Sequence, residues 1–135
     1  MSADRHIILI PMGGAPRLLP AASNTSLLDQ LEDLVGGHVS AIPAPEWLGD
    51  RHHAVVACHP QVGIASRANA LAGRVLGVPM HGPCVLLRRP IDDSDLYRQE
   101  RESSRRFTAF DSNSAREALA SLGREIEQMH DGPKD

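Results

Sequence analysis

The stretch Ser26–Pro43, SLLDQLEDLVGGHVSAIP, decides the fold because a helix and a strand follow one another in it without a linker. Ser26 is the expected N-cap, and Asp29 places a negative charge in the first turn, where the helix dipole is positive. The apolar residues of the helix fall on one face at helical spacing, and they are Leu27, Leu28, Leu31, Leu34 and Val35. Gly36 can adopt the left-handed conformation that ends a helix. Residues His38–Ile42 then predict a strand that stops at the following proline.

Three further apolar runs outside this stretch predict strands. Each run is short and is bounded by proline, by glycine or by polar residues such as Gly49-Asp50-Arg51. The runs are His6–Ile10, His53–His59 and Cys84–Arg89. Because the first two are almost continuously apolar, we expect them to be covered on both faces of a sheet.

Two segments after the central stretch have the periodicity of amphipathic helices. Ser66–Leu76 carries apolar residues on one side, with Ser66 as the expected cap and Gly77 as the expected end. Ser114-Ala115-Arg116-Glu117 is typical of a capping box and begins a helix of about four turns. The polar segment 91–113 before it predicts at most a short helix or a wrapping segment.

The order of these elements predicts an α+β fold. We expect a small mixed or antiparallel sheet of four or more strands, two central helices and a C-terminal amphipathic helix. Residues 1–90 should form a compact domain. Residues 91–135 should add a polar arm and the last helix, packed on the same domain or on a partner chain.

Composition and charge exclude several classes of protein. Aromatic residues make up only 3% of the 135 residues, so stacking platforms for single-stranded nucleic acid are not expected. The net charge is −3, with no concentrated basic run, so nucleic acid is not the expected partner. No apolar run reaches the ~18 residues of a membrane span, and the first residues lack the apolar segment of a secretory signal. We therefore expect a cytoplasmic protein that does not contact a membrane.

The glycine-rich stretch Pro11–Arg17 follows the first strand and allows two interpretations. Gly13 and Gly14 could let backbone N–H groups face a phosphate, with Arg17 adding positive charge and Arg67 contributing from elsewhere in the chain. A phosphate cradle, however, requires a helix directly after the glycines, and here prolines intervene. The turn of a β-hairpin is therefore the favoured interpretation.

Histidine and cysteine residues gather in two places, but their spacing does not predict a metal site. The two-residue gap between His81 and Cys84 suits zinc, whereas Cys58 and His59 are adjacent and should point to opposite faces of a strand. The sequence also lacks a recognisable catalytic motif. We therefore predict neither a metal nor another cofactor, and we assign no catalytic residue.

The segment Leu31–Pro43 resembles the hallmark of a family of small phage and plasmid proteins known as domain of unknown function 3846. In that family a helix ends in Val-Gly-Gly and a strand begins at once and ends in proline, as at Val35-Gly36-Gly37 here. The resemblance covers residues 6–89. It departs from the family pattern in one place, because Arg67 stands where an asparagine precedes the helical Ala70 by three residues. The resemblance implies a mobile-element origin and an α+β fold, and it carries no established activity.

Two functional hypotheses follow. The first is a non-enzymatic accessory protein of a phage or mobile element that binds a host or viral macromolecule, for example in counter-defence or host modulation. The alternative is a small phosphate- or nucleotide-binding protein or enzyme built around Gly13, Gly14, Arg17 and Arg67. Because the apolar stripe of the last helix must be covered, we also expect a homodimer in which the tail contributes to the interface.

Overall fold

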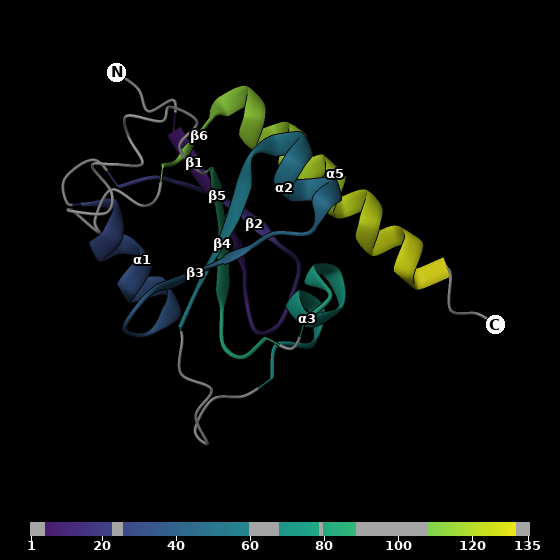
Figure 1. Ribbon diagram of the computed structural model, residues 1–135, viewed down its shortest axis with the longest axis horizontal. Coiled ribbons are helices and arrows are strands. Elements are labelled where there is room, and N and C mark those ends of the chain that lie inside the picture. The colour runs from purple at the N-terminus through teal and green to yellow at the C-terminus, as the bar shows by residue number, and fades with distance from the viewer. Residues whose placement is uncertain (1–4, 23–25, 60–67, 79, 89–107, 132–135) are drawn as a thin grey trace.

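The computed structural model describes residues 5–22, 26–59, 68–78, 80–88 and 108–131, with side chains as far as residue 128. Within these residues a six-stranded antiparallel sheet has helices on both faces (Figure 1). The elements in chain order are β1 (Arg5–Ile10), β2 (Arg17–Pro20), α1 (Leu27–Val35), β3 (Ser40–Pro43), α2 (Glu46–His52), β4 (Ala54–Cys58), α3 (Ala70–Leu76), β5 (Cys84–Arg88), β6 (Phe110–Asp111) and α5 (Ser112–Asp131). The predicted α+β class is confirmed, and the sheet is antiparallel throughout.

The strand order β2-β1-β5-β4-β3 places β5 at the centre of the sheet. Among the described strands, β1 and β2 alone form a simple hairpin, and the connections from β2 through β5 each contain a helix. Helix α1 covers one face, and helices α2, α3 and α5 cover the other (Figure 1). The C-terminal helix packs on the sheet. None of the helices in the described residues is long and apolar enough to cross a membrane.

Alternating side chains from the same strands supply both cores. On β5, Cys84 and Leu86 belong to the core under α2, α3 and α5, whereas Val85 and Leu87 belong to the core under α1. All four side chains are completely buried. Because both faces of a central strand exclude water, the strand must be apolar at successive positions, which explains its continuous apolar run.

The short strand β6 is inserted between the ends of β1 and β5. His6 on β1 pairs with Pro20 of β2 on one side and with Phe110 of β6 on the other. Arg88 on β5 pairs with Ala54 of β4 and exchanges two backbone hydrogen bonds with Thr108. The segment 108–111 therefore fills the gap where β1 and β5 separate. Phe110 is completely buried there, and its side chain is the largest of the fully buried ones in the described residues.

The first helix follows the prediction, whereas the starts of the other two predicted helices were wrong. Ser26 Oγ accepts a hydrogen bond from the Asp29 backbone N–H at 3.1 Å, and Gly36 ends α1 with φ 88°. Helix α3 begins at Ala70 and is capped by Asn69, and the expected cap Ser66 lies outside the described residues.

The C-terminal helix begins at Ser112, two residues before the predicted capping box. Asp111 accepts the Ser114 backbone N–H at 2.8 Å, so an aspartate caps the helix and Ser114 lies within its first turn. The predicted segment 91–113 lies outside the described residues as far as Phe107, and its end forms β6.

Helix α2 and strand β2 were not predicted. The seven residues of α2 include the polar run at 49–51, and Pro45 occupies the N-cap position without a side-chain hydrogen bond. A Cβ at Gly49 would lie 3.0 Å from the Ala44 carbonyl oxygen, so a larger residue would crowd this helix start. The four residues of β2 pair with β1 and follow the glycine-rich turn.

Candidate functional site

The predicted ligand-binding glycines form the turn of the β1–β2 hairpin. Gly13, Gly14 and Arg17 are exposed, and Gly14 has φ 98°, a conformation that favours glycine. A strand follows the turn where a phosphate cradle would need the N-terminus of a helix. Arg67 lies outside the described residues. A binding role for these four residues stays a prediction.

A buried asparagine, Asn69, stabilises the end of the sheet from which the β1–β2 turn extends. Asn69 is 1% exposed, and its Nδ2 donates to the carbonyl oxygens of Ile10 at 3.2 Å and Gly82 at 2.9 Å. Its Oδ1 accepts the Ala72 backbone N–H at 3.1 Å, and its own N–H donates to the Met80 carbonyl at 2.8 Å. The side chain thereby joins the end of β1, the start of α3 and the approach to β5. Because these bonds occupy both amide donors and the amide oxygen, Asn69 stabilises the fold and leaves no donor for a ligand.

A second buried polar group lies between α2 and α5. His52 Nε2 is 2.9 Å from Ser121 Oγ, and Arg124 Nη2 donates to the same oxygen at 3.2 Å. Ser121 is only 7% exposed, although it lies on a helix whose opposite side faces solvent. The contact joins residues 69 positions apart and holds α2 against α5.

Burial is the main reason that the pKa of His52 lies below its ordinary value. Arg51, Arg124 and His53 lower the pKa further, and Glu117 opposes them. The imidazole is therefore neutral at pH 7. A neutral ring with its proton on Nδ1 accepts the Ser121 O–H at Nε2, and the Ser121 oxygen accepts the Arg124 N–H.

Two adjoining clefts open beside this contact. Both are lined by Arg51, Ser121 and Arg124. The larger, of about 240 Å³, also includes His52, Glu117 and Ala120. The smaller, of about 140 Å³, also includes Trp47, Glu125 and Gln128. We call the residues Trp47, Arg51, His52, Glu117, Ser121, Arg124, Glu125 and Gln128 the α2–α5 surface.

The chemistry of this surface suits recognition better than bond cleavage. A serine hydrogen-bonded to a neutral histidine is the start of a nucleophile and general-base arrangement. Ser121, however, lies in the interior of α5, where neighbouring backbone N–H groups bond within the helix and cannot stabilise an oxyanion. The surface instead offers charged contacts from Arg51 and Arg124. Beside them, His52 offers a hydrogen-bonding contact and Trp47 an apolar one.

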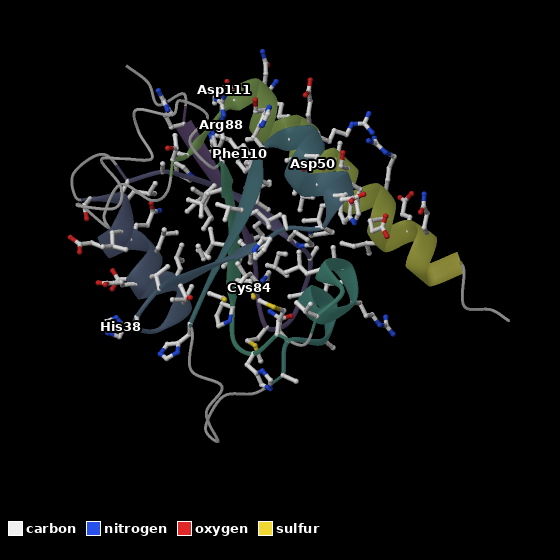
Figure 2. The ribbon with its side chains drawn as sticks, viewed as in Figure 1. His38, Asp50, Cys84, Arg88, Phe110 and Asp111 are labelled. Atoms are coloured by element: carbon white, nitrogen blue, oxygen red, sulfur yellow. The ribbon has the colours of Figure 1, made fainter. Side chains whose placement is uncertain are left out.

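A third cleft, of about 390 Å³, lies at the start of α5. Asp111, Ser112, Asn113, Ser114 and Glu117 line it. The Ser114 backbone N–H is the main cause of the lowered pKa of Asp111. Arg88 lies 3.9 Å from the same carboxylate, and Figure 2 shows the two side chains next to each other. The polar groups that line this cleft are those that cap the start of α5.

The histidines and cysteines do not come together as metal ligands in the described residues. No group of three His, Cys, Asp or Glu side chains there is placed to hold a metal ion. Cys58 and Cys84 are both buried in the core under α2, α3 and α5, and His81 pairs with Ala68 outside the named strands.

Comparison of the chain with protein-family models, with curated proteins and with solved structures gives no match. The interpretation of the site therefore depends on its own residues. Sequence patterns missed both Asn69, because Ser66 was the expected cap, and the contact between His52 and Ser121. One indication of the latter was available, since Ser121 lies three residues after Ala118 within the apolar stripe of the helix.

Proposed function

We propose that this chain is a non-enzymatic accessory protein of a phage or other mobile element, and that it binds a host or viral protein through the α2–α5 surface. The observation that carries the proposal is the half-buried Trp47 beside the exposed Arg51 and Arg124. Tryptophan and arginine are enriched among the residues that dominate protein–protein affinity. Here they surround clefts that already exist in the free chain.

The charge on the surface favours a protein over a nucleic acid. Arg51 and Arg124 alternate with Glu117 and Glu125, so positive and negative groups are interspersed. A phosphate backbone is attracted by a surface of one sign and is repelled by interspersed carboxylates. A protein partner can present charges of both signs to such a pattern.

The mobile-element origin is supported by the resemblance to domain of unknown function 3846. The resemblance is carried by Leu31–Pro43, and the departure at Arg67, three residues before Ala70, remains. On this proposal the protein acts in the cytoplasm of the host cell, in counter-defence or host modulation.

Affinity capture with charge-reversed variants tests the proposal. The full chain is used as bait in a host lysate beside Arg51→Glu on α2 and a matched control, Arg74→Glu on α3, since both arginines are exposed. We expect one stoichiometric partner to bind the wild type and the Arg74→Glu control but not the Arg51→Glu variant. Equal capture by all three chains, or by none, contradicts a partner at the α2–α5 surface.

A small anionic ligand is the second candidate, since two guanidinium groups and an imidazole meet at the larger cleft. Thermal unfolding in the presence of inorganic phosphate and nucleotides tests it. A ligand at about 100 times its dissociation constant adds about 2.7 kcal/mol of stability. A shift abolished by Arg51→Glu assigns the ligand to the cleft, and one abolished by Arg17→Ala assigns it to the glycine-rich turn. Unchanged melting with every compound excludes this candidate.

We also propose that the chain forms a symmetric homodimer to which the tail contributes. Arg88 and Thr108 are paired, yet nineteen residues separate them in sequence. A connection of this length permits β6 and α5 to occupy the same positions on a second copy. Size-exclusion chromatography with light scattering should give twice the mass of 14.6 kDa at micromolar concentration, and a monomer contradicts the proposal.

A further inference from the structure

The two cysteines of the chain stand opposite each other on neighbouring strands. In the register of β4 with β5, Val56 lies opposite Leu86 and Ala57 lies opposite Val85. The next residue along β4 is Cys58, and the next position on β5 is Cys84. Directly opposed residues of antiparallel strands have Cα atoms about 4.5–5.5 Å apart. This separation falls within the ~4.4–6.8 Å that a disulfide bond requires.

Both cysteine side chains also lie on the same face of the sheet. They belong to the core under α2, α3 and α5, and both are free thiols. Cys84 is completely buried and Cys58 is 7% exposed, so Cys58 is the thiol that solvent reaches first. The Cys84 thiol donates a weak hydrogen bond to the Gly82 carbonyl oxygen at 3.6 Å. Cys84, labelled in Figure 2, is the first residue of β5, two residues after the Gly82 carbonyl group that accepts a hydrogen bond from Asn69 Nδ2.

We propose that Cys58 and Cys84 are a redox modification site at which a reversible cross-strand disulfide joins β4 to β5. The oxidant is a low-molecular-weight disulfide such as glutathione disulfide. The Cys58 thiolate attacks one sulfur of the oxidant, which forms a mixed disulfide and releases one glutathione thiolate. Cys84 then attacks Cys58 Sγ, and its proton passes to the second glutathione thiolate as that group leaves. Two protein thiols are oxidised, and one glutathione disulfide is reduced to two glutathione molecules.

Burial makes this reaction slow and selective in the folded chain. Burial raises the pKa of Cys58, and it raises the pKa of Cys84 to about 12 with a further contribution from the nearby Cys58. Both groups are therefore thiols at neutral pH and resist casual oxidation. Once the mixed disulfide forms on Cys58, its partner is held on the opposite strand, so closure is intramolecular.

The disulfide would hold together the part of the fold that surrounds Asn69. The bond closes the chain between Cys58 and Cys84, a loop that contains α3 and the approach to β5. Gly82 would lose the thiol donor but keep its hydrogen bond from Asn69 Nδ2. Cross-linking a loop of this length lowers the entropy of the unfolded chain, and we expect the melting temperature to rise by roughly 10 °C.

Intact-mass measurement of the folded full chain tests the proposal. After incubation with glutathione disulfide and alkylation of the remaining thiols, we expect a loss of about 2 Da, no alkylation and reversal by dithiothreitol. The single variants Cys58→Ser and Cys84→Ser are the controls, and neither should lose this mass. They also show whether any rise in melting temperature requires both sulfur atoms.

Three outcomes would overturn the inference. The first is two alkylated thiols in the folded wild type under conditions that oxidise the unfolded chain. The second is a disulfide that joins two chains rather than two strands. The third is an internal disulfide that leaves the melting temperature unchanged. None of these results depends on partner capture by the α2–α5 surface, so this inference and the proposed function fail independently.

Discussion

In the part of the chain that the structure describes, the core under α1 is aliphatic, whereas the core under α2, α3 and α5 also includes both cysteines. Among the described residues, the buried polar side chains are Asn69 and Ser121, and both belong to the elements of this second face. A purely aliphatic core depends mainly on shape and volume, and at this face the specific contacts of α1 lie at its surface, where Gln30 bonds to the Ala22 N–H and the Pro20 carbonyl oxygen. A buried polar group needs a defined partner, so the second face depends on particular contacts at each helix. The second face is therefore the one whose stability depends on particular polar contacts, and it is the face to which we propose that a partner binds.

Phe110→Ala should cause the largest loss of stability on either face. The side chain is completely buried in the core under α2, α3 and α5 and belongs to the inserted strand β6. Its removal leaves a cavity and should cost about 3–5 kcal/mol in the free energy of unfolding. Urea unfolding measures the loss. Leu31→Ala in the core under α1 is the matched variant, and a cost near zero for Phe110→Ala would show that β6 does not complete the fold.

A smaller loss should follow Asn69→Ala. The change leaves the Ile10 and Gly82 carbonyl groups and the Ala72 N–H without the side-chain partners that they have in the folded chain. We expect a cost of about 2–3 kcal/mol by urea unfolding. Asn69→Ser keeps an acceptor for the Ala72 N–H and should recover about 1 kcal/mol of this. Equal costs for the two variants would mean that capping of α3 is not part of the role of Asn69.

Loss of the N-cap of α1, on the aliphatic face, should lower the stability of the fold less than Asn69→Ala does. Ser26→Ala removes the oxygen that accepts the Asp29 N–H at the start of α1, and both residues are exposed. The expected cost is about 1 kcal/mol, and Ser26→Asp should restore most of it. A loss as large as that of Asn69→Ala would contradict the view that α1 is held mainly by its apolar contacts.

The smallest expected effect is a pH dependence of the free energy of unfolding that arises from His52 on the second face. The pKa of His52 is lowered in the folded chain, so the unfolded chain binds more protons in the range just below pH 6.5. The contribution of neutral His52 to stability is therefore complete above pH 6.5 and decreases as the pH falls below that value. Urea unfolding from pH 5 to 8 should show this decrease in the wild type and not in His52→Gln. A decrease of equal size in the variant would assign it to other groups.

The elements that the sequence predicted best are those whose causes are local. Helix α1 has its cap, its stripe and its final Gly36 within a dozen residues, and the apolar runs mark the strands buried on both faces. Helix α2 is too short for periodicity to show, and Pro45 gives it no side-chain cap. Strand β6 is defined only by pairing with β1, about a hundred residues earlier in the chain.

The candidate site was harder to predict because its contacts join residues that are far apart in the sequence. The contact between His52 and Ser121 and the position of Cys58 opposite Cys84 depend on how distant elements pack, and neither follows from spacing. The glycine-rich turn was visible because glycine and proline act locally. Its place in a β-hairpin agrees with the favoured interpretation of the sequence. No local pattern indicates whether the turn binds a ligand.

Site-specific photocrosslinking compares the two faces most directly. A photoreactive residue is placed at Arg51 on the α2–α5 surface or at Asp33 on α1, since both positions are exposed. Each full chain is irradiated in host cells, and covalent adducts are resolved by mass. We expect one protein adduct from position 51 and none from position 33. An adduct from position 33 alone, or equal adducts from both positions, would contradict the claim that the face carrying α2 and α5 binds the partner.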